Sequence, residues 1–412
     1  MAWAKAVSAF HGRVTVIDES TRLTDMNIKP ASVSGETLLI EPRIEYIYER
    51  KLVHRQQGPY SPRTNEEVEA GLLRLFHAEG LSDVVISKLA RMTGGASKEQ
   101  FAFTLSHRQQ PEPQRYVLRM DPLEGIVETC RLREAELLNA LQGVVPVPPV
   151  LSVDPEGDYL GLPGVITQFV PGVTKPTDQA SQSVSGIGSS YGRYAEIIAP
   201  QFLNILVSLH SKNDWDKASL PSFSIPKPST KEAAMYQVNA WSRVWRDDFV
   251  EPVPMMTLTE NWLRENAPVC EAPCLVHCDY RLGNFMFEEP SGKITTILDW
   301  ELAHFGDFHE DLAWILQKLF GTWSEQGDFL VCGLMKRDMF IDQYQRLSGR
   351  TINPDTLRYY EVLNAWKCAV MDYSSAIIAG KNSNNHQDLL ITWLASAGAV
   401  FLDQIEKLIR EA

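Results

Sequence analysis

The chain has 412 residues, of which 44% are hydrophobic and 22% charged, and its formal net charge is −13. This composition argues against disorder of the whole chain. The negative charge, without any basic run, argues against nucleic acid as a partner. Since one core rarely serves so many residues, two domains or lobes are expected.

The cysteines and the apolar segments bear on the compartment. The N-terminus lacks the sustained apolar run of a signal peptide, and no later stretch reaches the ~20 consecutive apolar residues of a membrane span, so a cytoplasmic protein without membrane contact is expected. The six cysteines are few for this length and favour a reducing compartment. Cys270, Cys274 and Cys278 match neither a zinc nor an iron–sulfur spacing, so ordinary thiols are expected.

The first part of the chain has mixed patterns. Residues 1–64 combine short alternating segments, Ile44–Tyr48 among them, with turn-rich joints, and form an extension whose role the sequence does not indicate. A capped amphipathic helix is expected from Asn65. Strand patterns follow in VVISKLARM, FAFTLSH and RYVLRMD, then a helix over Val127–Leu141, a hairpin-like region and the apolar strand GVITQFVPG. Residues 65–170 are therefore predicted to form a small lobe with five strands and one helix after the third.

Beyond the small lobe the patterns are mainly helical. The expected helices are Tyr194–His210, Lys231–Arg246, Asp311–Phe320, Leu334–Leu347, Pro354–Ala379 and His386–Ile409. The exception is one apolar hairpin, FMFEEPSGKITTILDW. The predicted fold class is α+β, with a small mixed lobe built on an antiparallel sheet and a larger, mainly helical lobe over residues 171–412.

One constellation carries chemistry, LVHCDYRLGNFMF followed by KITTILDWE. Phosphoryl transfer needs a carboxylate that accepts the hydroxyl proton, and an amide oxygen and a second carboxylate that hold Mg²⁺ against the phosphates. Asp279, Asn284 and Asp299 supply this set, because a tight loop can aim the first two inward and the hairpin returns the third beside them. His277 is expected to brace the loop.

With this constellation and the segment ILDWELAHFGDFHEDLAW, the chain resembles the aminoglycoside phosphotransferase-type (phosphotransferase enzyme) family over roughly residues 80–400. The resemblance implies a protein-kinase-like fold and transfer of the γ-phosphate of ATP, with Mg²⁺, to a hydroxyl group of a small molecule. It makes Asp279 the catalytic base, and Asn284 and Asp299 the Mg²⁺ ligands. Asp307 and Asp311 match two further family positions, where helix-capping or loop-bracing carboxylates are expected.

The resemblance also implies a nucleotide site. The loop TGGASKEQF matches the turn that covers the phosphates, since glycines let backbone N–H groups approach phosphate oxygens. Arg119 stands on the third strand, where many relatives carry Lys, and is expected to pair with the phosphates and with Glu134. The residues assigned to nucleotide binding are Gly94, Gly95, Ala96, Ser97, Arg119 and Glu134, together with the hinge backbone at Gln168, Phe169 and Val170.

Cys278 departs from the family, whose members commonly carry Gly after the His. A small thiol fits there if the backbone does not need a positive φ, and it can make the enzyme sensitive to thiol reagents. The acceptor stays open between an aminoglycoside, a hydroxyacyl-CoA and another small alcohol, as do oligomeric state and the choice between ATP and GTP. A nucleotide-binding pseudokinase that serves as an interaction module is the alternative from another class. A protein kinase is disfavoured because no D-F-G and A-P-E pair frames an activation loop.

Overall fold

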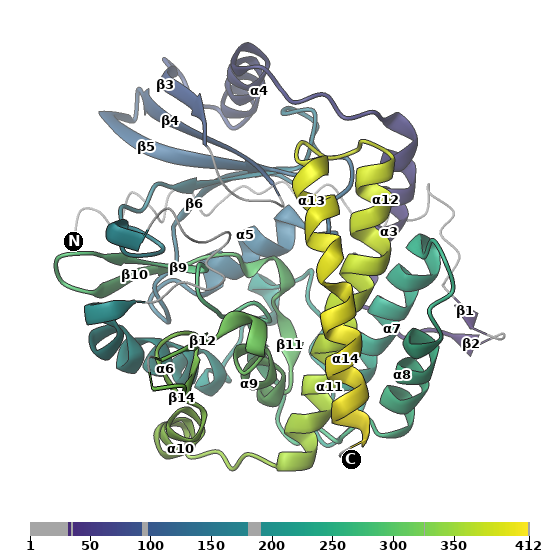
Figure 1. The fold of residues 1–412 in the computed structure, drawn as a ribbon. Coiled ribbons are helices and arrows are strands. Elements are labelled where there is room, and N and C mark those ends of the chain that lie inside the picture. Colours follow the sequence, from purple (N-terminus) through teal and green to yellow (C-terminus); the bar gives the residue numbers. More distant parts are fainter. Residues whose placement is uncertain (1–31, 34–35, 93–97, 180–190, 325, 411–412) are drawn as a thin grey trace. The chain divides into compact units, whose positions relative to one another are not determined.

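A computed structural model of the chain describes residues 32–33, 36–92, 98–179, 191–324 and 326–410 (Figure 1). The chain divides into two compact units, residues 1–38 and residues 39–412. The described part of the first unit is a pair of short antiparallel strands, β1 (Ser32–Val33) and β2 (Glu36–Thr37). The rest of the predicted extension, from Leu39, belongs to the second unit.

The small lobe of the second unit is built on a five-stranded antiparallel sheet in the order β3-β4-β5-β7-β6. Its strands are β3 (Val85–Arg91), β4 (Glu99–His107), β5 (Gln110–Met120), β6 (Val150–Asp154) and β7 (Gly164–Gln168), and helix α5 (Arg131–Ala140) follows the third of them. The predicted sequence of elements is therefore correct.

Alternation along the strands assigns the two faces of this sheet. In β5, Tyr116, Leu118 and Met120 are buried and belong to a hydrophobic core that also contains residues of β4 and of helix α4 (Asn65–Ala78). Because successive side chains of a strand point to opposite faces, Val117 and Arg119 face away from this core. Arg119 thus lies on the side of the sheet where α5 brings its carboxylates.

The residues before the sheet form two helices. Helix α4 begins at Asn65, as predicted, and its N-cap is Thr64, which forms a capping box with Glu67. Residues Pro42–His54 form helix α3, so the strand-like reading of Ile44–Tyr48 is wrong. Here Pro42 occupies the first turn of the helix, where its missing N–H costs nothing.

Helix α3 makes ion pairs with elements far away in sequence. Arg43 contacts Glu156, in the β6–β7 connection of the small lobe, at 2.8 Å. Lys51 pairs with Asp248 of the large lobe, whose side chain is fully buried, and Arg55, the residue that follows the helix, adds a second contact to this carboxylate at 2.7 Å. The helix therefore links the two lobes through charges that are mostly shielded from water.

The large lobe is mainly helical, as predicted, and the α+β fold class is confirmed. Its helices are α6 (Ala195–Ser211), α7 (Glu232–Asp248), α8 (Pro254–Glu265), α9 (Phe308–Ile315), α10 (Arg337–Ser348), α11 (Pro354–Val370), α12 (Ala376–Lys381), α13 (Asp388–Leu394) and α14 (Gly398–Arg410). Its short strands are β8 (Cys274–Val276), β9 (Phe285–Glu288), β10 (Lys293–Ile297), β11 (His304–Gly306), β12 (Thr322–Trp323), β13 (Phe329–Val331) and β14 (Met335–Lys336).

The last two helices lie beside α11 and α12 (Figure 1). Within the described residues, the stretch Leu389–Arg410 is long and apolar enough to cross a bilayer, by length and composition alone. Its α14 part packs against α11 and buries Phe401 and Ile405, as a core helix of a folded domain also does. This feature alone is weak support for membrane insertion.

Candidate active site

Two short strand pairs position the loop that carries Asp279. Strand β8 ends just before the loop and pairs with β11, while β9 and β10 form the hairpin that follows it. In this hairpin Phe285 is opposite Ile297, so Asn284 and Leu298 are neighbours, and Leu298 N–H donates to the Asn284 carbonyl at 2.8 Å. The register therefore returns Asp299 to the loop, as the sequence predicted.

His277 braces this loop from inside. Its Nε2 lies 2.9 Å from the Leu298 carbonyl, and its Nδ1 lies 3.2 Å from the Asp279 backbone nitrogen. The neutral tautomer that satisfies both contacts donates from Nε2 and accepts at Nδ1. Burial lowers the pKa of His277, which keeps the ring neutral in this bracing position.

The two further family carboxylates act on the backbone. Asp311, fully buried, accepts from the N–H groups of His277 at 2.8 Å and Cys278 at 2.6 Å, and its third contact is His210 Nε2 at 3.0 Å. Asp307 caps α9 and accepts from His309 N–H at 3.0 Å. Asp311 thus braces the loop and Asp307 caps the helix, which are the roles expected from the sequence.

Asp279 is held on both carboxylate oxygens and is 9% exposed. One oxygen accepts from Arg281 Nε at 2.6 Å and from the Trp314 indole N–H at 2.9 Å, and the other accepts from the Asn284 amide. Burial raises the pKa of Asp279, Arg281 lowers it and the charge of Asp299 raises it, with a net increase. The carboxylate is fixed in orientation and is a stronger base than one in water.

Asn284 and Asp299 fit a divalent cation. The amide nitrogen of Asn284 donates to Asp279, including its backbone carbonyl at 2.9 Å, so its amide oxygen is the atom left to act as a ligand. Asp299 has a left-handed backbone, with φ 66° and ψ 52°. An amide oxygen and a carboxylate are the hard donors that Mg²⁺ prefers.

Arg119 joins the sheet to this set. Its guanidinium contacts Glu134 of α5 at 2.5 Å, the pair expected from the sequence, and Asp299 at 2.8 Å. Burial raises the pKa of Asp299, but Arg119, Arg281 and His277 together lower it by more, so this carboxylate stays ionised. Arg131, one turn before Glu134, forms a second ion pair with the same glutamate.

The predicted nucleotide contacts are described only in part. Gly94, Gly95, Ala96 and Ser97 lie outside the described residues. At the hinge, Gln168 N–H donates to the Pro149 carbonyl at 2.8 Å and Phe169 N–H to the Arg115 carbonyl at 2.9 Å, so these two donors serve the protein's own backbone. Among the described residues, Val170 N–H is the hinge donor that makes no such bond.

Cys278 has a positive φ of +59°, whereas the thiol was expected to fit here on condition that the backbone does not need a positive φ. Such a backbone favours glycine. The thiol is 2% exposed, and burial above all raises its pKa well above the ordinary value. A buried, protonated thiol reacts slowly, so the structure opposes the expected sensitivity to thiol reagents.

The thiol belongs to a buried group with His304 and Glu310, whose ligand atoms lie within 4.8 Å of one another. Such a set can ligate a metal ion. However, Glu310 already pairs with the Lys367 ammonium and lies 3.2 Å from His304 Nε2. Burial raises the pKa of Glu310, but Lys367 and His304 lower it to about 2. The carboxylate charge is thus balanced by the protein itself.

The backbone at Cys278 predicts opposite responses to two substitutions. We expect Cys278→Val to destabilise the fold by about 2 kcal/mol, because a β-branched side chain is strained at positive φ. Cys278→Gly should change the free energy of unfolding by less than about 1 kcal/mol, since relief of strain offsets the lost packing. Urea unfolding measures both, and an equal loss in the two variants would contradict this account.

Several residues of the site were not predicted from the sequence. Arg281 and Trp314, which fix Asp279, lie in the segments that carried the resemblance, but neither was singled out. Lys98, next to the glycine loop, is 3% exposed and lies 3.5 Å from Asp121 and 3.9 Å from Glu301. A lone lysine after a loop gives no sequence signal of such burial.

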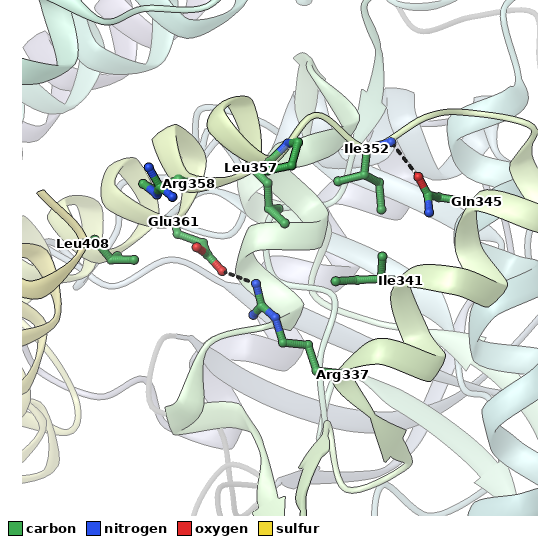
Figure 2. Close-up of a pocket in the computed structure, with 9 residues that line it drawn as sticks. Arg337, Ile341, Gln345, Ile352, Leu357, Arg358, Glu361 and Leu408 are labelled. Atoms are coloured by element: carbon green, nitrogen blue, oxygen red, sulfur yellow. Dashed lines mark hydrogen bonds and ion pairs between the residues drawn. The ribbon is translucent and has the colours of Figure 1, made fainter. Parts of the chain in front are cut away.

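A surface pocket lies elsewhere in the large lobe. It has a volume of about 370 Å³ and is lined by residues of α10, α11 and α14 and of the connection between the first two. Figure 2 shows Arg337 directed toward Glu361, at 3.0 Å, and the apolar side chains of Ile341 and Leu357 facing the same space. None of the predicted site residues lines it.

The chain is similar to known phosphotransferases in sequence and in fold. The profile of the phosphotransferase enzyme family matches residues 88–365, more than half of the chain. The chain belongs to the phosphotransferase enzyme family. This phosphotransferase also resembles a solved structure from Ralstonia eutropha, provisionally named an aminoglycoside phosphotransferase, with a TM-score of 0.56 and 20% identity over 85% of this chain and 99% of that one. The likeness supports the fold, which is protein-kinase-like.

Curated relatives of the phosphotransferase are longer proteins. It is 28% identical to mouse acyl-CoA dehydrogenase family member 10 over 235 residues, which are 55% of this chain and 20% of that protein. It is 25% identical to acyl-CoA dehydrogenase family member 11 of Pongo abelii over 287 residues, 66% of this chain and 35% of the relative. The phosphotransferase thus spans a fifth to a third of the length of these relatives.

Proposed function

We propose that this phosphotransferase is a small-molecule kinase that moves the γ-phosphate of ATP to a hydroxyl group of a small acceptor. The observation that carries the proposal is the fixed carboxylate of Asp279, held by Arg281, Trp314 and Asn284 beside the return of Asp299. An oriented base beside a cation-ligating pair is the arrangement that phosphoryl transfer requires.

In this mechanism Asp279 accepts the proton of the acceptor hydroxyl. The hydroxyl oxygen forms a bond to the γ-phosphorus while the bond from that phosphorus to the bridging oxygen of ADP breaks. Asn284 and Asp299 would hold Mg²⁺, which supplies charge neutralisation for the phosphates when bound. Arg119, oriented by Glu134, would add its positive charge at the same place.

The acceptor class is proposed from the family and the relatives' names. A small hydroxylated compound is a suitable acceptor for a phosphotransferase. The names of the relatives suggest two candidates to test, a hydroxyacyl-CoA and an aminoglycoside. We also propose a cytoplasmic location, in keeping with the six buried free cysteines among the described residues. The intact set of Asp279, Asn284 and Asp299 favours catalysis over a pseudokinase role.

The proposal is tested by ADP release from MgATP with pooled hydroxylated metabolites, aminoglycosides and hydroxyacyl-CoAs. We expect release that depends on one pool and disappears in Asp279→Ala. MgATP binding without release in every pool would overturn the kinase function and favour the pseudokinase.

Asp299→Ala should separate the role of the metal from that of the nucleotide. We expect MgATP to bind at least about tenfold more weakly, because one of two cation ligands is lost, while metal-free ATP binds as before. Calorimetry with and without Mg²⁺ measures both affinities. Wild-type protein that binds ATP equally well with and without Mg²⁺ would contradict the assignment of Asp299.

A further inference from the structure

Helix α11 does not end regularly. Residues Met371–Ser375 form one turn of π-helix between α11 and α12. A π turn contains an extra residue, so it changes which side chains face a given neighbour, and such turns are frequent at functional sites. Two of its side chains have partners: Ser374 donates to the Val370 carbonyl at 2.5 Å, and Ser375 to Asp248 at 2.9 Å.

Asp372, in the same turn, has no such partner. Its side chain is 8% exposed, one carboxylate oxygen is fully buried, and neither oxygen accepts a hydrogen bond from the described residues. Burial alone raises its pKa to about 7. A buried carboxylate without a partner lowers the stability of the fold. Its presence in the core of the lobe is therefore explained better by a function than by stability.

Gln317, just beyond α9, is in the same situation. It is 2% exposed, and neither its amide oxygen nor its amide nitrogen has an oxygen or nitrogen partner among the described residues. It lies three residues after Trp314, the residue whose indole binds Asp279. Helix α9 packs against α11, the helix that leads into the π turn, so two connected parts of the lobe each present an unsatisfied polar side chain.

Cys368 connects these side chains to the base. It precedes Asp372 by four residues on the helix, and the Gln317 side chain lies close enough to its thiol to lower the pKa of that thiol. Burial, then the charge of Asp372 and then that of Asp279 raise the pKa of this thiol, so both carboxylates lie within electrostatic reach of one sulfur. Cys368 thus lies within reach of the charge of Asp372 and of that of Asp279.

We propose that Asp372 and Gln317 form an acceptor subsite, in which the Asp372 carboxylate accepts a hydrogen bond from a second polar group of the acceptor while the reacting hydroxyl lies at Asp279. The inference rests on the proposed function, because it takes Asp279 as the base. The second group is a hydroxyl or an ammonium, since Asp372 needs a donor. An acceptor with a lone hydroxyl leaves the carboxylate buried and unpaired.

Matched probes test this donor requirement. Ethanolamine and choline both carry a hydroxyl and a positive charge, but only ethanolamine has N–H donors. Butane-1,4-diol and 4-methoxybutan-1-ol form the neutral pair. We expect the wild-type protein to bind at least one donor-bearing probe about tenfold or more tightly than its capped counterpart, by calorimetry with and without MgADP.

In Asp372→Leu this preference should fall below about threefold, while Asp355→Asn, a change at an exposed carboxylate of the same helix, should leave it intact. No preference in the wild type, or a preference that survives in Asp372→Leu, would overturn the subsite. Binding with the expected preference but without ADP release would uphold the subsite and remove the kinase function, so the two failures are distinguishable.

Asp372→Asn provides a second readout if the leucine variant does not fold. A carboxylate whose pKa is raised in the folded state costs no stability below its unfolded pKa of about 4 and its full penalty above about 7. The neighbouring thiol of Cys368 stays uncharged over this range. We therefore expect Asp372→Asn to melt at a higher temperature than wild type at pH 8 and at the same temperature at pH 4, with a weaker probe preference. A lower melting temperature at pH 8 would mean that Asp372 has a structural partner, and would overturn the subsite.

Discussion

Asp279→Ala is expected to lower phosphoryl transfer by roughly 10²- to 10⁴-fold or more, while the affinity for MgATP stays within a few-fold. The side chain is the oriented proton acceptor, held by Arg281 and Trp314, and in the proposed mechanism it does not ligate the metal. Steady-state turnover and nucleotide calorimetry on the same preparation measure the two effects.

Asp403→Ala is the matched control, because Asp403 is an exposed carboxylate whose one partner among the described residues is Lys407, at the surface. Its turnover should equal that of the wild type. If Asp279→Ala also keeps full turnover, Asp279 is not the base and the assignment of the site falls.

Asp311→Ala is expected to destabilise the fold by about 3–5 kcal/mol. The substitution leaves the N–H groups of His277 and Cys278 buried without an acceptor, and removes the partner of His210 Nε2. Denaturant unfolding measures the loss, and the same variant should lose turnover because the loop carries Asp279.

Asp307→Ala is the comparison for this prediction, since Asp307 caps α9 at the exit of β11 and a lost cap costs about 1 kcal/mol. Asp311→Asn should lie between the two, because an amide retains one acceptor oxygen. A loss of 1 kcal/mol or less in Asp311→Ala would show that the loop does not depend on this carboxylate.

The sequence predicted those parts of the fold that local patterns determine. Alternation in β4 and β5, and the turn residues around Asp279 and Asn284, reflect contacts between close neighbours along the chain. The geometry of the catalytic loop follows from the hairpin register, which a short apolar pattern fixes. The order of strands and the position of α5 could therefore be predicted from the sequence.

Features that depend on contacts between residues far apart in the sequence could not be predicted. The alternation at Ile44–Tyr48 suggested a strand, but the segment is a helix whose charges meet partners more than 100 residues away. One extra residue in a helical turn leaves no periodic signal, so the π turn at Asp372 is hidden within the predicted helix Pro354–Ala379. The contact of Trp314 with Asp279 arises only when α9 packs beside the loop.

The ion pairs of α3 bear on how this catalytic unit is inherited. The family profile begins at residue 88, yet the fully buried Asp248 inside that span takes its positive partners from Lys51 and Arg55, upstream of it. A gene fusion that transferred only the matched span would leave a buried charge without compensation, a defect that costs several kcal/mol. The span that has to be transferred for the domain to fold is thus longer than the span that the family profile matches, because it includes helix α3.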